Sequence, residues 1–599
     1  MSHTPTPNAS QKKFIAKRFS AKRLAVVAVF IVLISGTVLS SVGFVAQPES
    51  FFEVTKNIEL LGRIYREVSQ NYVDELSVTN FMRAGIDGML STLDPYTVFM
   101  DEEQSDDIDQ LTTGKYAGIG ISLSAREGDA IVTSVNEGYS AAKAGMRVGD
   151  KIIKIDGKET RGKTTTYVRG LIKGEPKTEV KLTIEREGER EPLEFNLVRL
   201  EIILKNITYA NLIDDSGVGY VDIQRFSLRV SEDLGSSLRT LQDSAKARGV
   251  KLQGVVLDLR DDPGGLLDVA VNVTDKFVEK GSTVVTTRGR DSSRVRSYIS
   301  QQVPVMKDVP MAVLINGGSA SASEIVAGAI QDLDRGVIVG TRSFGKGLVQ
   351  TVTRLPYNTS LKITTAKYYT PSGRLIQEVN YFDRNKREGK RDVFSVMPDT
   401  MHKAFKTKNG RTVYDGGGIT PDVIIGDRDL TALEEELYRK SFYFKFATRY
   451  QSRNPKLAGV FKADDKLFAE FKAYLAEQKF EYKSEAEKQL DALSETVTKN
   501  SYADAVASDI KRLQVSVRTE KDKDLERQKD RILNDLEQEI VSRYGGDSAR
   551  LRASFKLDDQ VREAVAILKD QKRYEKLLAA GTEVGDGKVI KKEVKKKKK

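Results

Sequence analysis

The chain has 599 residues, of which 39% are hydrophobic and 30% are charged, and its net charge is +11. This length predicts three or four domains rather than one. The absence of cysteine excludes disulfides, thiol nucleophiles and Cys-ligated metals. The only histidines are His3, in the leader, and His402, in a basic stretch. A Ser-His-Asp triad or a zinc site is therefore disfavoured, and we expect no metal and no cofactor.

The positive charge gathers at the two ends, with six basic residues in 12–23 and seven lysines in 591–599. The middle of the chain is closer to neutral, so we expect no nucleic-acid partner. Residues 24–46 carry no charge, and as a helix they would span roughly 35 Å, enough for a bilayer core of ~30 Å. The positive-inside rule makes 1–23 a cytoplasmic leader and 24–46 a single-pass transmembrane signal-anchor.

The part of the chain after residue 46 is then expected at the cell membrane, on the periplasmic or extracytoplasmic side. The alternative is secretion after signal cleavage. Residues 50–110 are predicted to form a helical N-terminal region, because Ile58, Leu61, Ile64, Tyr65 and Val68 recur with a helical period. A second helix is expected near 81–90. This helical cap or dimerisation arm allows a homo-oligomer.

Short strands and glycine turns follow over 112–199, with a helix-like stretch near 167–172. The order of a glycine-bearing loop, an Ala-Gly turn, a strand ending in Asp-Gly and a helix resembles a PDZ domain. The amides of Gly118, Ile119, Gly120 and Ile121 are expected to hold a terminal carboxylate, and the next strand edge would pair with an extended peptide. The expected partners are protein substrates with apolar C-terminal tails, and the two isoleucines suggest an apolar pocket. The alternative is a small β domain without a ligand.

Residues 200–428 alternate buried-type strands with helices, which predicts an α/β core. Within it, 380–414 is a basic, poorly patterned insert. Residues 429–585 carry apolar stripes between Glu/Lys faces, which is typical of a packed helical extension, with a partner-binding arm as the alternative. The lysine-rich end, 586–599, is expected to be a solvated tail, with an anionic surface as the alternative target. The predicted fold class is thus a multidomain α/β (α+β) protein.

Three segments of this core carry the chemistry. A buried strand ends at 316–318, and the small-residue run Ser319–Ser323 opens a helix, a corner that can expose a serine hydroxyl. Lys346 lies between two glycines, with Gln350 four residues on; near a serine in a dry cleft its pKa would fall, so that it could accept the serine proton. A third strand ends in a turn whose Gly264 and Gly265 could offer amides to an oxyanion. Taken one by one, the segments are also compatible with serines that only cap and pack the helix, a solvated turn lysine and a tight strand–helix turn.

Together these segments resemble the carboxyl-terminal processing peptidases, or tail-specific proteases, from roughly residue 50 to 425. The resemblance rests on GSASASEIVAGAIQD, SFGKGLVQ, TTAKYYTPSGRLIQ and GGGITPDV. It implies a serine nucleophile 25 positions before the lysine base, which selects Ser321 with Lys346, and an assisting Gln350. It also implies oxyanion amides from Ala322 and from Gly264 or Gly265. Asp262 stands where the family usually has asparagine, which adds a possible negative charge near the oxyanion site.

The resulting hypothesis is a serine endopeptidase that cuts proteins near their C-terminus by a Ser–Lys dyad through an acyl-enzyme. A PDZ-like domain would recognise the substrate tail. The alternatives are a catalytically inactive PDZ scaffold and an apolar-ligand binding protein on the same fold, neither of which needs a lysine base.

Overall fold

The computed structural model describes residues 49–379 and 402–581 together with residue 584, apart from residues 215, 292, 294, 427, 458 and 501–503. The chain divides into two compact units, Met1–Gly88 and Met89–Lys599. The predicted membrane anchor at 24–46 and most of the predicted insert at 380–414 lie outside the described residues. Within the described part, no helix combines the length and apolarity needed to cross a membrane.

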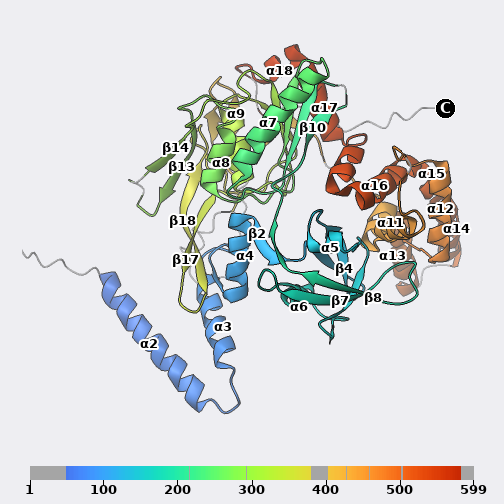
Figure 1. Ribbon diagram of the computed structural model, residues 1–599, viewed down its shortest axis with the longest axis horizontal. Coiled ribbons are helices and arrows are strands. Elements are labelled where there is room, and N and C mark those ends of the chain that lie inside the picture. Colours follow the sequence, from blue (N-terminus) through green and yellow to red (C-terminus); the bar gives the residue numbers. More distant parts are fainter. Residues whose placement is uncertain are drawn as a thin grey trace, which may run out of the picture. The chain divides into compact units, whose positions relative to one another are not determined.

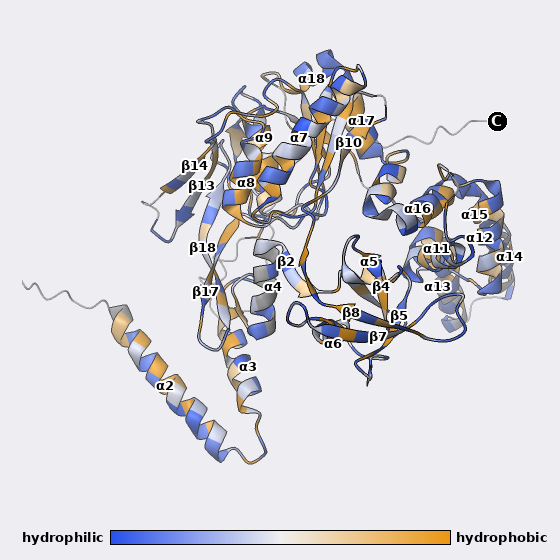
Figure 2. Cartoon of the chain, viewed as in Figure 1, coloured by the Kyte–Doolittle hydropathy of each residue, from blue (hydrophilic) through white to orange (hydrophobic). Residues whose placement is uncertain are grey.

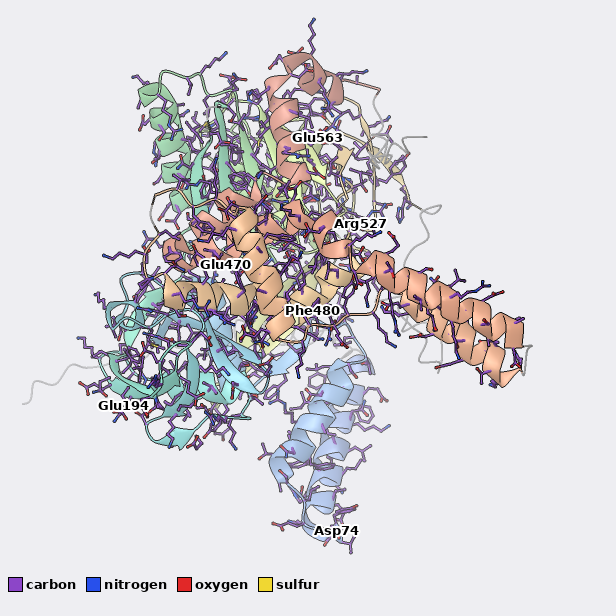
Figure 3. The ribbon with its side chains drawn as sticks, turned by 90° about the vertical axis from the view of Figure 1, so that its right-hand side faces the viewer. Asp74, Glu194, Glu470, Phe480, Arg527 and Glu563 are labelled. Carbon is purple, nitrogen blue, oxygen red and sulfur yellow. The ribbon has the colours of Figure 1, made fainter. Side chains whose placement is uncertain are left out.

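The described part of the first unit is helical, as predicted from the apolar period. Helix α2 spans Glu49–Asn71, and α3 begins at Val78 and runs to Leu90. The rings of Tyr65 and Phe81 stack with centroids 5.7 Å apart. Asp74 lies at the turn between the two helices (Figure 3). Apolar and polar residues alternate along α2 (Figure 2), and its apolar residues are largely exposed, including Phe52 at 69%.

The second unit begins with a short strand, a capped helix and a two-stranded ribbon that leads into the predicted PDZ-like domain. Asp101 caps α4 in a capping box with Gln104. The PDZ-like sheet has the order β3-β4-β5-β7-β8, so β3 is an edge strand. These elements are β1 Val98–Met100, α4 Glu102–Thr113, β2 Lys115–Gly118, β3 Ile121–Arg126, β4 Asp129–Val135, α5 Ser140–Lys143, β5 Lys151–Ile155, β6 Lys158–Glu159, α6 Thr165–Ile172, β7 Glu179–Glu185, β8 Leu193–Val198 and β9 Leu200–Ile203.

The central sheet of the predicted peptidase core has the order β10-β11-β12-β15-β16-β21. Strands β11, β12, β15, β16 and β21 are parallel, and β10 is antiparallel to β11. The buried apolar runs of the sequence form these strands, as expected for a sheet covered on both faces. They are β10 Ile207–Ile213, β11 Val218–Ile223, β12 Gly254–Asp258, β15 Met311–Ile315, β16 Val337–Gly340 and β21 Val423–Ile424.

The two faces of this sheet are covered by helices from distant parts of the sequence (Figure 1). Helices α7, α8 and α9 pack on one face through alternate strand residues such as Val255 and Val313. Helices α17 and α18 pack on the other face against Val256 and Leu314. The C-terminal segment therefore completes the core. The helices are α7 Val230–Ala247, α8 Leu267–Thr274, α9 Ala322–Asp332, α17 Asp559–Lys569 and α18 Gln571–Leu577.

A second sheet stands beside the core, with the order β1-β18-β13-β14 and with β17 paired to β18. Several of the remaining helices share an apolar core of their own, built around Phe446, Phe471 and Ile532. The other elements are β13 Thr283–Gly289, β14 Val295–Ile299, β17 Leu348–Arg354, β18 Ser360–Tyr369, β19 Ala404–Lys406, β20 Thr412–Tyr414, α10 Ala432–Arg439, α11 Phe442–Arg453, α12 Asp465–Glu477, α13 Glu485–Lys499, α14 Asp504–Lys521, α15 Asp524–Arg527 and α16 Lys529–Ser554.

Candidate active site

The candidate site lies where three neighbouring parallel strands end. The turn with Gly264 follows β12, Ser321 follows β15 and Lys346 follows β16. The strands are in register, since Leu257 pairs with Val313 and Val313 with Ile338. Parallel strands present their carboxyl ends at one edge of the sheet, where α/β proteins bind ligands. Segments that the sequence separates by up to 82 residues are thus gathered at one edge.

Ser321 sits on a strained corner between β15 and α9. Its backbone has φ 55° and ψ −109°, a conformation rare for a residue with a side chain. The hydroxyl groups of the two neighbouring serines make hydrogen bonds to the backbone. Ser319 donates to the carbonyl of Leu259 at 2.7 Å, and Ser323 donates to that of Asp262 at 3.0 Å. Both are fully buried, whereas Ser321 is partly exposed. The exposed, strained position favours Ser321 among the three serines.

The glycine turn lies directly against this corner. A Cβ atom placed on Gly264 would lie 2.7 Å from the amide nitrogen of Ala322 and 3.0 Å from the Cβ of Ser321. With φ at 92°, this position needs glycine. The Gly264 N–H donates to the Oδ1 atom of Asp262 at 2.8 Å. Gly265 instead lies against Phe226, whose carbonyl would be 2.3 Å from its Cβ.

Glu324 joins the serine corner to the lysine loop. One of its carboxylate oxygens accepts the N–H of Ser321 at 2.8 Å and that of Lys346 at 3.0 Å. The other accepts the N–H of Gly345 at 2.7 Å and the Ser343 hydroxyl at 2.6 Å. Burial raises the pKa of Glu324 to about 7, against the lowering effect of these four donors. This fully buried side chain fixes the backbones of Ser321 and Lys346 to one another.

The side chain of Lys346 is half-buried under an aromatic ring. Its Nζ atom lies 4.7 Å from the ring centroid of Tyr96. The Tyr368 hydroxyl lies 3.2 Å from the carbonyl oxygen of Ser321 and 2.5 Å from that of Lys346, which adds a second link between the two. Burial, and then the positive charge of Lys362, lower the pKa of Lys346 to about 8. A substantial fraction of this amine is therefore neutral near physiological pH.

Two predicted site groups have contacts that the sequence alone did not indicate. The Gln350 side chain donates to the Thr364 hydroxyl at 3.3 Å, so its amide is engaged with β18. In the PDZ-like loop, Ile119 is only 1% exposed and belongs to the domain core, so its side chain does not line an open apolar pocket. Ile121, at the start of the edge strand β3, remains partly exposed. Gly118 and Gly120 flank Ile119, and Gly120 has φ 84°.

Sequence reasoning missed Glu324, Tyr368 and Tyr96. Glu324 carried a signal, because Ser321 and Glu324 have the Ser-x-x-Glu spacing of a capping box. The two tyrosines reach the site through the fold alone. Among the described residues, no group of three or more His, Cys, Asp or Glu side chains is placed to hold a metal ion.

Comparison with known proteins matches four successive parts of the chain to family models. Residues 217–381 match "Peptidase family S41", 131–186 match "PDZ domain", and 433–568 match "Probable PDZ-protease, C-terminal helical domain". Residues 37–104 match "Activating protease CtpB N-terminal domain". The carboxy-terminal-processing protease of Bartonella bacilliformis is 41% identical over 324 residues, which cover 54% of this chain and 73% of that protein. The chain belongs to the carboxy-terminal-processing proteases of peptidase family S41.

A second curated relative agrees with this assignment. A protein of Staphylococcus aureus described as "Probable CtpA-like serine protease" is 31% identical over 69% of this chain and 82% of its own length. The photosystem II D1 C-terminal processing protease is 29% identical over 52% of this chain and 88% of its own, with a TM-score of 0.31. The chain is thus a serine-type peptidase with a PDZ domain and a helical C-terminal domain. The sequence-based family prediction is confirmed.

Proposed function

We propose that this protease cleaves proteins near their C-terminus with Ser321 as nucleophile and Lys346 as general base. The observation that carries the proposal is the pair of Glu324 bonds to the backbone of both residues, at 2.8 and 3.0 Å. It is supported by the lowered pKa of Lys346, because a base must be neutral before it can accept a proton.

In the proposed reaction, the neutral amine of Lys346 takes the hydroxyl proton of Ser321 while Oγ bonds to the substrate carbonyl carbon. Collapse of the tetrahedral species breaks the C–N bond, and the Lys346 ammonium gives its proton to the leaving amine. A water then attacks the ester, transferring a proton to Lys346, and the acid product leaves as Ser321 regains its proton. The Ala322 amide and the Gly264–Gly265 turn would hold the oxyanion. We propose that Gln350, which lies on β17, orients the side chain of Lys346.

The test is Ser321→Ala, which should give a folded protein with no measurable cleavage of an unstructured substrate. Ser319→Ala and Ser323→Ala are matched controls, because each removes a buried hydroxyl bond from the same corner. Both should keep far more activity than Ser321→Ala. Near wild-type cleavage by Ser321→Ala would refute the assignment. A wild-type chain that binds apolar ligands or tails without cutting them would favour the non-catalytic alternatives.

We also propose that the PDZ domain selects substrates by a free, apolar C-terminus. The support is the edge position of β3, which α6 flanks, so that an extended tail can add to the sheet beside the amides of Gly118–Ile121. Matched substrates that end in a free apolar residue, an amidated apolar residue or two aspartates would test this. Equal rates for all three would contradict tail recognition.

For the first unit, we propose anchoring in the membrane through 24–46 and self-association through α2. The support is the uncharged span with its basic flank, and the exposed apolar residues Phe51, Phe52 and Ile58 on α2. Fractionation of cells with protease shaving tests the anchor and the extracytoplasmic location of the catalytic part. A freely soluble mature chain starting near Gln47 would favour a cleaved signal. Sedimentation of a Phe52→Ser, Ile58→Ser variant tests the oligomer.

A further inference from the structure

The turn beside the proposed nucleophile contains a buried carboxyl group that the reaction above does not use. Asp262 is 0% exposed. Its Oδ1 atom accepts the Gly264 N–H at 2.8 Å, while its buried Oδ2 atom has no hydrogen-bond partner among the described residues. An asparagine, which the resemblance leads one to expect here, would keep the bond to Gly264 without a negative charge.

The backbone of Asp262 is held at the site by hydrogen bonds to residues on both sides of Ser321. Its carbonyl accepts the Ala320 N–H at 3.0 Å and the Ser323 hydroxyl at 3.0 Å. Gly264, which it holds, would contact the amide of Ala322 through any added Cβ. The carboxyl group is therefore built into the structure that would bind the oxyanion.

We propose that Asp262 is a positioning residue that must be protonated for acyl transfer. Its ionisation would prevent the Gly264 turn from stabilising the oxyanion. This inference rests on the proposed roles of Ser321 and Ala322. A carboxylate would retain the Gly264 N–H through a charge-assisted bond and would oppose the negative charge that develops on the substrate oxygen. A neutral carboxyl group removes the repulsion and weakens its hold on Gly264.

The surroundings of Asp262 allow such a proton to be present near neutral pH. Burial raises the pKa of Asp262 to about 7 and Asp222 on β11 also raises it, while the Gly264 N–H, Arg225 and the Ser323 hydroxyl lower it. The first turn of the facing helix α9 carries Glu324, which accepts four hydrogen bonds, and the lysine loop contributes Lys346. Because Asp262 is an acid that must stay protonated, activity should be lost as pH rises through its pKa.

The decisive experiment compares kcat/KM of Asp262→Asn with that of the wild-type full-length protein between pH 6 and pH 9. If only the protonated form is active, the variant should equal the wild type at pH 6 and exceed it about twofold at pH 7 and about tenfold at pH 8. This ratio does not depend on the pKa of Lys346, which both proteins share. A ratio that stays constant across the range, at any value, would overturn the proposal.

Two further variants exclude a merely structural explanation. Asp222→Asn removes a charge that raises the pKa of Asp262, so the pH at which wild type and Asp262→Asn diverge should fall in that background. Arg225→Gln should move the same midpoint to higher pH. The proposal would be contradicted if the midpoints did not move, or if both variants moved the midpoint in the same direction. Failure of the dyad itself would be recognised separately, because Ser321→Ala would then remain active.

Discussion

The lowered pKa of Lys346 predicts the effect of removing a second positive charge, that of Lys362. Lys362 on β18 is the second cause of this shift, after burial. Replacing it by glutamine should raise the pKa of Lys346 and so reduce the neutral, active fraction of the amine at low pH. Lys362→Arg keeps the charge and should leave the pKa where it is.

The expected magnitude follows from the pKa itself. At pH 6, a lysine with a pKa of about 8 is about 1% neutral, roughly 300-fold more than a lysine with the ordinary pKa of 10.5. Lys362 contributes less to this factor than burial does, so we expect Lys362→Gln to lose about threefold to tenfold in kcat/KM at pH 6. The deficit should shrink as pH rises past the pKa of Lys346.

The assay is kcat/KM on a fluorogenic peptide from pH 6 to pH 10 for the wild type, Lys362→Gln and Lys362→Arg. A pH-independent deficit in Lys362→Gln would point to lost substrate contacts rather than to a shifted pKa. Equal losses in both variants, or wild-type activity of Lys362→Gln at pH 6, would refute the reasoning.

Three further variants test the supports of the site. Lys346→Arg should lose about a thousandfold or more, because arginine stays protonated; activity within tenfold of wild type would remove the general-base role. The glutamine of Glu324→Gln cannot accept all four hydrogen bonds, so kcat should fall more than KM rises. Thermal stability should also drop, because each donor left without a partner costs about 1–3 kcal/mol. An unchanged kcat would contradict the linking role of Glu324. Gly264→Ala should inactivate, since its Cβ would meet the Ala320 carbonyl at 2.5 Å, whereas Gly317→Ala, with open space around it, should stay active.

Local patterns explain why much of the site was predictable. The run Ser319–Ser323 after a buried strand, and the glycines beside Lys346, predict corners and turns whatever the rest of the chain does. The apolar period of 58–68 likewise predicts α2, which the structure contains. The spacing of 25 residues between Ser321 and Lys346 singled out this serine only because the family has the same spacing.

Contacts between distant segments were beyond such patterns. Tyr96 covers Lys346 from 250 positions earlier in the chain, and Tyr368 approaches both proposed dyad residues from β18. The burial of Ile119 depends on which face of its loop meets the PDZ core, and a glycine-rich segment has no periodicity from which that face could be predicted. Helices α17 and α18 looked like part of an extension, yet they cover one face of the central sheet.

The central claim is that Ser321 becomes covalently acylated with the help of Lys346. Its most direct test is to treat the full-length protein with a peptidyl fluorophosphonate, which bonds phosphorus to a nucleophilic oxygen as fluoride leaves, and to locate the adduct by mass spectrometry. One adduct is predicted, on Ser321, absent from Ser321→Ala and formed far more slowly in Lys346→Ala. An adduct on another residue, or full peptidase activity after complete labelling of Ser321, would contradict the account.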